Sequence, residues 1–396
     1  MTTVSPWMPE IGLFAGGADL DVYRDGARRV MQGLPLYAGP VIHGLLYTYT
    51  PFSTLVFIPF GLLPGGSDKY IWMGLNIVLL VGIVALCWQM LGYRITPHLV
   101  AVSALLAMSC TFLEPVRTTL FYGQINLVLM LLVLWDCSRS ERSRLAGVGV
   151  GIAAGIKLTP TYFVLYYLAL RRWRAAVVAV ATIVATIGVS WIALPRDSRQ
   201  YWTDTFFEST RIAEDTHPSN QSLRGVIAHL TGAPAPTWLW LLLASGVVAT
   251  STWVVARLHR DGERLLAVTV AGMSAAVVSP FSWSHHWVWF VPLMVYAVHR
   301  ALANQWWWTA VLGIYAAAGA WAYRWDEKIV VVGLFLFPPS WALTTVLQNT
   351  YVLVYAVVMV VAATITVRAK RHRRQESSRL GSTSGVALLA IRQSHR

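Results

Sequence analysis

Apolar runs long enough to cross a membrane recur along this chain from residue 70 almost to its end. A helix needs about 20 consecutive apolar residues to span the hydrocarbon core of a bilayer. Charged residues make up only 12% of the sequence, whereas soluble domains carry about 25%. The pattern therefore predicts an all-α, polytopic integral membrane protein, with spans at residues 70–91, 98–113, 122–137, 174–194, 237–257, 265–281, 287–303, 306–323 and 351–367.

Two further apolar stretches are interrupted. The run 145–170 contains GIKLTP at 155–160, which places Lys157 close to a helix-breaking proline. Such residues are tolerated at membrane depth only where protein or water surrounds them, so we expect two short half-helices with Lys157 near their tip. We expect the stretch 329–345, with FPPS at 337–340, likewise to fail to cross fully. The bundle would then hold about nine to eleven transmembrane helices plus re-entrant segments.

The net charge of +13 is concentrated in short loops and in the C-terminal segment. Loops rich in Lys and Arg stay in the cytoplasm, which assigns that side to residues 137–144, 171–174, 257–264 and 368–374. Counting spans from these loops places other polar segments outside, namely everything before residue 70 and residues 114–121, 195–236, 282–286 and 324–328. Because topology explains the positive charge, we expect a plasma-membrane protein that contacts membrane lipids and binds no nucleic acid.

An N-terminal segment on the outer side has to be exported, yet residues 1–16 contain neither a signal peptide nor a spanning helix. Our hypothesis is that the true start lies upstream and that a first transmembrane helix is missing from this chain. The alternative is that a short N-terminus is translocated behind the first helix. Residues 1–367 are expected to form one membrane domain, with outer loops at about 1–69 and 195–236, and residues 368–396 a basic, disordered cytoplasmic tail.

Unusual polar residues collect on the outer side of this topology. After Asp19, Asp21 and Asp25 come the candidate binding residues Tyr23, Tyr49, Glu114, Arg117, Gln124, Asn126, Lys157, Arg211, Asn220, Gln221, His285 and His286. A carboxylate at the boundary of water and lipid could act as general base, and cations could neutralise a lipid-linked phosphate leaving group. Aromatic faces can stack on sugars, and amides can bind sugar hydroxyls. This set is typical of a membrane glycosyltransferase that uses a polyprenyl-phosphate sugar, and is also compatible with other phosphate-lipid chemistry.

Other interpretations of these residues stay open. Asp25 could flank a surface helix, and Glu114 could form a local ion pair with Arg117, three residues on. Neighbouring residues on a helix point about 100° apart, so only one of His285 and His286 is expected to face a site. A pair of adjacent histidines does not by itself predict a metal site, and we expect none.

Six motifs occur along the chain in a fixed order. They are DLDVYRDGARRVMQGLPLY (19–37), LYTYTPFSTLVFIPFGLLP (46–64), EPVRTTLFYGQINLVLMLLVL (114–134), GIAAGIKLTPTYFVLYYL (151–168), YWTDTFFESTRI (201–212) followed by NQS, and SPFSWSHHWVWFVPLM (279–294). Together they resemble glycosyltransferase family 87, the polyprenyl-phosphate-mannose-dependent α-mannosyltransferases of mycobacteria and their relatives. The resemblance covers the chain from about residue 19 to 300. It implies a GT-C fold, a multi-helix membrane bundle with its active site at the extracytoplasmic (periplasmic) face.

The resemblance also assigns roles. The presumed general base of the family opens a D-x-x-V/I-Y motif and falls on Asp19, while Asp21 stands where relatives vary. The SWSHHW histidines are expected near the donor phosphate, and the KLTP and EPxRxxxxxGQxN motifs carry further predicted contacts. The sugar donor of the family is a polyprenyl phosphate and not a nucleotide sugar, so no cofactor is expected besides the donor substrate.

The resemblance implies inverting transfer of mannose from polyprenyl-phosphate mannose to a lipid-anchored glycan, with an α-1,2 linkage. The acceptor would be of the phosphatidylinositol mannoside, lipomannan or lipoarabinomannan type. One alternative is a transporter or flippase for a lipid-linked sugar, which should show repeat symmetry and polar groups at mid-bilayer. The chain shows no repeat, and Lys157 is the only feature that favours a transporter. The other alternative is a GT-C transferase of another polyprenyl-phosphate sugar.

Overall fold

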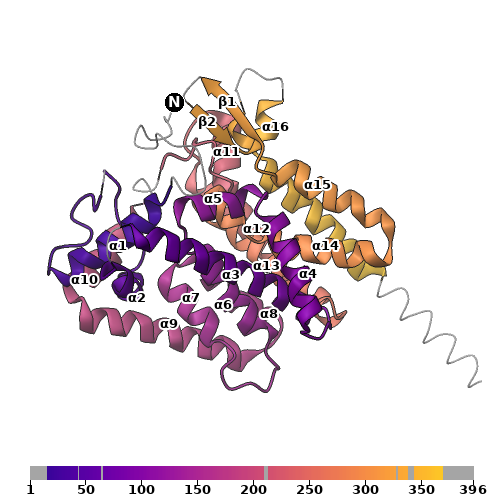
Figure 1. Cartoon of the computed structure of the whole chain (residues 1–396), viewed down its shortest axis with the longest axis horizontal. Helices are drawn as coiled ribbons and strands as arrows, with labels where there is room; N and C mark the ends of the chain where they lie inside the picture. The colour runs from indigo at the N-terminus through magenta and orange to yellow at the C-terminus, as the bar shows by residue number, and fades with distance from the viewer. Residues whose placement is uncertain are drawn as a thin grey trace, which may run out of the picture.

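The predicted all-α architecture is confirmed by a computed structural model that describes residues 16–42, 44–63, 66–208, 213–326, 329–337 and 343–368. Apolar helices pack side by side in a bundle (Figure 1). They are α3 (Ser67–Met90), α4 (Pro97–Cys110), α6 (Asn126–Ser138), α9 (Trp173–Ala193), α12 (Thr237–Arg260), α13 (Arg264–Val278), α14 (Phe290–Ala303), α15 (Trp308–Ala318) and the C-terminal helix Thr350–Arg368. Each overlaps one of the predicted spans.

Four helices of the described segments are long and apolar enough to cross a membrane by themselves: α3, α9, α12 and the C-terminal helix. A fifth crossing would combine α5 (Glu114–Tyr122) with α6, although the two are bent by 120° at the turn between them. Helices α4, α13, α14 and α15 have 11 to 15 residues each and are shorter than the spans predicted for them. The chain is therefore a multi-pass membrane protein, and at four of the predicted spans the described helices are shorter than a full crossing needs.

The apolar run 145–170 is broken where its sequence predicts. Helix α7 (Val148–Ile156) ends at Lys157, whose backbone is extended, and a 3-10 turn (Thr159–Thr161) leads into α8 (Tyr162–Ala169). Asp136 caps the start of α7 by accepting the backbone N–H groups of Gly147 and Val150, each at 2.8 Å. This cap satisfies two of the donors that a helix start leaves unpaired.

Helix α7 lies unusually close to α9, because its glycines leave no side chain between the two backbones. A β-carbon on Gly151 would collide with Thr182, and one on Gly155 would collide with Thr186. Glycine at these positions is therefore required by packing and not by backbone conformation. The contact fixes the level at which Lys157 leaves the helix.

Four shorter helices lie outside the candidate spans: α1 (Ala18–Met31), α2 (Pro51–Gly61), α10 (Pro195–Thr203) and α11 (Leu223–Thr231). Helix α1 follows Gly17, which has a φ of 114°. It carries Asp19 and Asp21 in its first turn and basic residues in its last, as the helix dipole favours. Helix α2 is capped by the Thr50 side chain, which accepts the Ser53 N–H.

A two-stranded antiparallel hairpin after α15 was not expected from the sequence. Helix α15 ends at Ala318, so the span predicted at 306–323 stops early, and β1 (Ala322–Asp326) pairs with β2 (Ile329–Val332). The β-branched run IVVV favours a strand over a helix. A 3-10 turn (Leu334–Leu336) and the short α16 (Thr344–Gln348) follow, so the described part of 329–345 contains no spanning helix, as predicted. Of the predicted tail 368–396, Arg368 ends the C-terminal helix and residues 369–396 lie outside the described segments.

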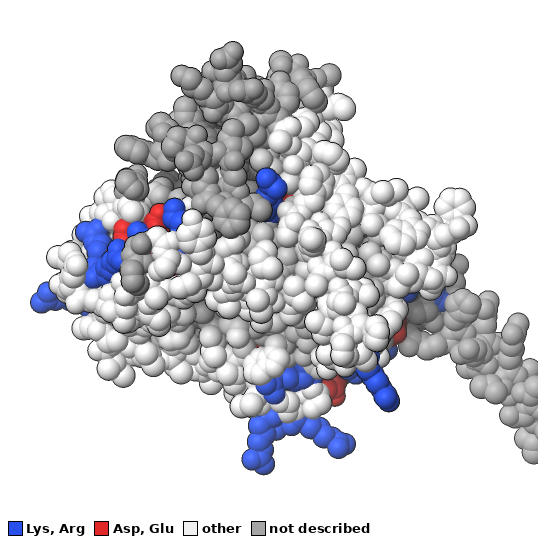
Figure 2. All heavy atoms as spheres, viewed as in Figure 1, with Lys and Arg blue, Asp and Glu red and all other residues white. Residues whose placement is uncertain are grey.

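Four basic segments gather at one end of the bundle. Basic residues follow the C-terminal ends of α6 and α12 and precede α9 and α13. On the face shown in Figure 2, Lys and Arg side chains gather at a few places on a largely uncharged surface. From the basic end, α6 leads back to Asn126 and α13 leads forward to residues 279–289. The polar residues predicted to form a site therefore lie at the opposite end from the basic loops.

Candidate active site

Five segments that are far apart in sequence bring polar side chains into one cluster. They are the start of α1, the residues before α2, the turn between α5 and α6, the break after α7, and the 3-10 turn η4 (Ser284–Trp287). Their contributions are Asp19, Tyr23, Tyr49, Gln124, Asn126, Lys157, His285 and His286, all of them predicted site residues.

Gln124 organises the part of the cluster around Asp19. The hydroxyls of Tyr23 and Tyr49 lie 2.9 and 3.1 Å from its amide oxygen and donate to it. Burial raises the pKa of the Asp19 carboxyl from 3.8 to about 6, against the smaller lowering effects of a hydrogen bond from Gln124 and the charge of Lys157. Asp19 is therefore ionised at neutral pH and still basic enough to accept a proton.

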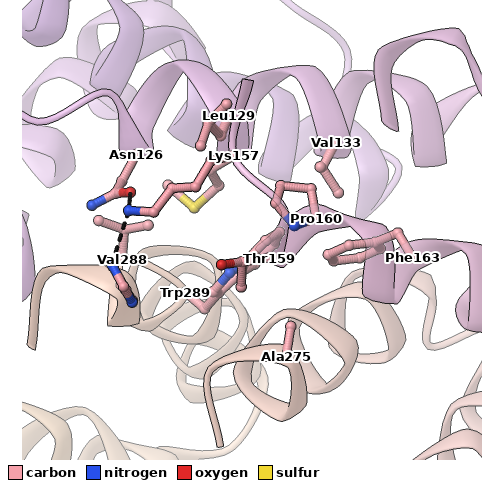
Figure 3. A pocket seen from close by; sticks show the side chains of 12 residues that line it. Asn126, Leu129, Val133, Lys157, Thr159, Pro160, Phe163, Ala275, Val288 and Trp289 are labelled. Atoms are coloured by element: carbon pink, nitrogen blue, oxygen red, sulfur yellow. Dashed lines mark hydrogen bonds between the residues drawn. The ribbon is translucent and has the colours of Figure 1, made fainter. Parts of the chain in front are cut away.

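Lys157 follows the end of α7 and extends its side chain toward Asn126 (Figure 3). Its ammonium group lies 3.1 Å from Oδ1 of Asn126 and 2.8 Å from Nε2 of His286. It also lies 5.3 Å from the centre of the Tyr49 ring, within range of a cation–π interaction. Asn126 fixes this arrangement because its amide nitrogen donates to the backbone carbonyl of His285 at 2.9 Å.

The two histidines have different partners. An ammonium group can only donate, so Nε2 of His286 accepts from Lys157 and the His286 proton belongs on Nδ1. Nε2 of His285 is buried and has no hydrogen-bond partner in the described part of the chain. Burial and the charge of Lys157 hold the pKa of both rings well below the usual value for histidine, so both are neutral. His285 is thus the ring with a free polar atom to offer a ligand.

Glu114 lies behind the histidines and is fully enclosed. Its carboxylate accepts the hydroxyls of Ser284 at 2.7 Å and Tyr351 at 2.5 Å. These three residues, which we call the hydroxyl clasp, tie the start of α5 and the start of the C-terminal helix to the turn that carries His285. The local ion pair with Arg117 that the spacing allowed is absent, and Arg117 is half-buried on α5.

Asn220 and Gln221, predicted to bind sugar hydroxyls, are buried and bonded within the protein. Oδ1 of Asn220 accepts from the Ser222 hydroxyl at 2.8 Å and from the Ser282 N–H at 3.2 Å. The Gln221 side chain donates to the carbonyl of Gln348 at 2.6 Å and accepts the Tyr351 N–H at 3.2 Å. These contacts hold the loop 279–287 and the C-terminal helix together.

Two further carboxylates of α1 lie apart from the cluster. Asp21 pairs with Arg24 at 3.0 Å, and Asp25 contacts Arg24 at 3.1 Å. Arg211 lies outside the described residues. Within the described segments, no group of three or more His, Cys, Asp or Glu side chains could hold a metal ion.

Sequence reasoning missed several side chains around His285. The ring of Trp283 stacks on it and that of Tyr122 meets it edge-on, each with 6.2 Å between ring centres. Ser284 lies within the SWSHHW motif and could have been noticed there. Tyr351 lies beyond residue 300, where the sequence carries none of the six motifs and shows only apolar runs, so nothing near it in sequence pointed to the site.

A small apolar hollow opens beside Lys157 and His286. Figure 3 shows Lys157 and Asn126 at one side of it and apolar side chains around the rest. Its other lining residues are Leu129, Met130, Val133, Thr159, Pro160, Phe163, Ala275, Val288 and Trp289. A ligand with an anionic head and a long hydrocarbon chain fits this combination, because its charge meets an ammonium group and its chain meets apolar surface.

Comparison with known proteins gives a consistent result. A sequence model of glycosyltransferase family 87 matches residues 47–280. A polyprenol-phosphate-mannose-dependent α-(1-2)-phosphatidylinositol pentamannoside mannosyltransferase of Mycolicibacterium smegmatis is 37% identical over 65% of this chain and 62% of its own length. A polyprenol-phosphate-mannose-dependent α-(1-2)-phosphatidylinositol mannoside mannosyltransferase of Mycobacterium tuberculosis is 34% identical over 70% of this chain and 69% of its own.

More distant similarity extends to an enzyme that transfers a different sugar. An α-(1->3)-arabinofuranosyltransferase of Mycobacterium tuberculosis is 30% identical over 60% of this chain and 54% of its own length. The match therefore spans between about half and two thirds of these relatives. No solved structure matches the chain.

Proposed function

We propose, because the chain belongs to glycosyltransferase family 87, that it transfers mannose from polyprenyl-phosphate mannose to a lipid-anchored mannoside. The new bond would be an α-1,2 linkage, formed with inversion at the anomeric carbon. The acceptor class is a phosphatidylinositol mannoside, as the names of the M. smegmatis and M. tuberculosis relatives suggest. The reaction draws on this chain's own side chains and on its two substrates, without a resident cofactor.

The observation that carries this proposal is a single ammonium group at the polar end of an apolar hollow. A polyprenyl phosphate combines one phosphate group with a long hydrocarbon chain, and the hollow beside Lys157 offers both matching surfaces. Among the described residues, Lys157 is the cation in contact with the cluster. Its amine can neutralise the charge that grows on the phosphate as the sugar leaves.

The proton and charge changes can be assigned to residues. Asp19 takes the proton of the attacking acceptor hydroxyl, whose oxygen then bonds to the anomeric carbon of mannose. The bond from that carbon to the phosphate oxygen breaks, and the polyprenyl phosphate departs with one more negative charge than it had in the donor. Lys157 balances that charge, and Nε2 of His285 offers a further hydrogen bond. His286 keeps the lysine in place.

The site would face the extracytoplasmic side of the plasma membrane. The basic ends of α6, α9, α12 and α13 belong in the cytoplasm by the positive-inside rule. The cluster lies at the opposite end of α6 and α13 and would therefore open to the outside. A donor carried by a lipid can reach such a site without any soluble nucleotide sugar.

The test is transfer of radiolabelled mannose from polyprenyl-phosphate mannose to phosphatidylinositol mannosides, with wild type, Asp19→Asn and Asp21→Asn at equal membrane levels. We expect Asp19→Asn to lose transfer by about 10²-fold to 10⁴-fold, the usual contribution of a general base. Asp21→Asn is the matched control and should stay active. Equal activity of all three would remove Asp19 from the mechanism.

A second candidate function is arabinofuranosyl transfer, which the similarity to an arabinofuranosyltransferase supports. Transfer from polyprenyl-phosphate arabinose in place of the mannose donor would favour this second candidate.

A further inference from the structure

Tyr122 is the last residue of α5 and lies beside the start of α1. The next residue, Gly123, has a φ of 72°, and a β-carbon on it would collide with Leu20, the residue after Asp19. The two segments therefore touch next to the presumed base. The charges of Asp19 and Glu114 both act on the Tyr122 hydroxyl, which places that hydroxyl near the two buried carboxylates of the cluster.

Tyr122 also contacts the histidines. Its ring meets that of His285 edge-on, with 6.2 Å between ring centres, and the His285 ring meets that of His286 at 4.9 Å. His286 in turn accepts from the ammonium group of Lys157 at 2.8 Å. Tyr122 therefore borders the part of the cluster that holds Asp19 and the part that leads to Lys157.

The hydroxyl of Tyr122 differs from the other tyrosine hydroxyls of the cluster. Those of Tyr23 and Tyr49 donate to Gln124, and that of Tyr351 donates to a carboxylate. The Tyr122 hydroxyl has no hydrogen-bond partner in the described part of the chain, and its side chain is only half-buried. A neutral hydroxyl can donate and accept at once, as the hydroxyl groups of a sugar do. This group is therefore available to a sugar ligand.

The proposed reaction fixes where the sugar lies. In an inverting transfer the attacking oxygen and the leaving phosphate are on opposite sides of the anomeric carbon, so the base and the cation flank the transferred sugar. A side chain that borders both Asp19 and the histidines before Lys157 then faces that sugar. We propose that the Tyr122 hydroxyl binds a hydroxyl group of the transferred mannose and thereby helps to select the donor sugar. This inference rests on the proposed function.

The experiment combines one change in the enzyme with one change in the donor. Tyr122→Phe removes the hydroxyl and keeps the ring that contacts His285, so it breaks no hydrogen bond of the described segments and should reach wild-type membrane levels. The kcat/KM of mannose transfer is measured with polyprenyl-phosphate mannose and with analogues of this donor that lack the hydroxyl at carbon 2, 3, 4 or 6 of the sugar. Tyr296→Phe is the matched control, because its hydroxyl donates to Glu263, at the basic end of the bundle.

We expect Tyr122→Phe to lower kcat/KM for the mannose donor roughly tenfold, near the upper end of what one neutral hydrogen bond contributes. With one analogue the difference between wild type and Tyr122→Phe should vanish, because the missing hydroxyl is the one that Tyr122 binds. With the other analogues the roughly tenfold difference should persist, and Tyr296→Phe should match wild type throughout.

Two results overturn the inference while leaving the proposed function in place. They are a Tyr122→Phe variant as active as wild type with the mannose donor, and a loss in that variant that is equal for mannose and for every analogue. The second result would mean that no hydroxyl of the transferred sugar meets Tyr122. A wild type that transfers no mannose overturns the proposed function, and this inference with it.

Discussion

Three carboxylates in the first turns of α1 have three different surroundings. Asp21 and Asp25 are neutralised by arginines of the same helix, at 3.0 Å from Arg24 for Asp21 and 3.4 Å from Arg28 for Asp25. Among the described residues, Asp19 has no arginine partner and meets the Gln124 amide and the charge of Lys157 instead. Residue type and spacing do not separate these acids, because all three lie within two turns of one helix. Their surroundings in the fold distinguish them: Asp19 meets Gln124 and Lys157 from other segments, whereas Asp21 and Asp25 meet arginines of α1.

The raised pKa of Asp19 predicts how activity depends on pH. A general base must be unprotonated, so kcat/KM should fall about tenfold for each pH unit below a midpoint near 6. Gln124→Met removes a hydrogen bond that lowers the Asp19 pKa, so the midpoint should move to higher pH. The measurement is a pH profile of kcat/KM for mannose transfer, with Asp21→Asn as the control that keeps the wild-type midpoint. A wild-type midpoint near 4 would contradict this assignment of the base.

Among the structural elements, η4 depends most on distant parts of the chain. Its Ser284 is bound by Glu114 from α5, and its Trp287 donates to the backbone carbonyl of Gln221 at 3.1 Å. The C-terminal helix adds Tyr351, which shares the Glu114 carboxylate. A turn of four residues keeps its shape through these contacts, and the orientation of His285 follows from them.

The hydroxyl clasp can be tested through its two donors. Tyr351→Phe leaves one oxygen of a buried carboxylate unpaired, a cost of about 1–3 kcal/mol, and should lower kcat more than it raises KM. Ser284→Ala should act in the same way, and the double variant should lose less than the sum, because both act through Glu114. Tyr355→Phe is the matched control, since its hydroxyl contacts Ser274 at 2.9 Å, one turn further along the same helix. Equal losses in Tyr351→Phe and Tyr355→Phe would mean that the clasp has no special part in positioning His285.

The elements that sequence alone predicted are those specified by many residues at once. Each long helix rests on a run of apolar residues, and the break at Lys157 rests on a glycine, a lysine and a proline together. The hairpin at Ala322–Val332 was missed because its β-branched run is only four residues long and lies inside an apolar stretch, where hydropathy alone does not reveal a strand. The internal role of Asn220 and Gln221 was missed because an amide that binds backbone and one that binds sugar look the same in sequence.

For the whole molecule, the basic loops and the polar cluster lie at opposite ends of α6 and α13. Exposed arginines such as Arg142 and Arg174 mark one end, and the polar cluster marks the other. Helices α6 and α13 connect the two ends directly. This polarity was predictable, because the positive-inside rule uses the summed charge of whole loops and does not depend on the contacts of any one residue.

Cysteine labelling can test this topology. In a variant lacking the three native cysteines, which are buried, Thr203→Cys on α10 and Ser140→Cys after α6 both place an exposed thiol. A membrane-impermeant maleimide should label Thr203→Cys in intact cells and Ser140→Cys only after the membrane is opened. The reverse pattern would invert the protein and place the site in the cytoplasm.

The hydroxyl clasp also has a consequence for the timing of synthesis. Tyr351 reaches Glu114 across 237 positions of the chain, and Gln348 reaches Gln221 across 127. A ribosome delivers the segments in order, so Asp19, Lys157 and both histidines enter the membrane well before the last of the described helices. Until that helix arrives, Glu114 lacks one of its two hydroxyl donors and His285 lacks its final support. A growing chain therefore holds Asp19, Lys157 and both histidines before it holds the complete set of contacts around His285, which needs the helix Thr350–Arg368.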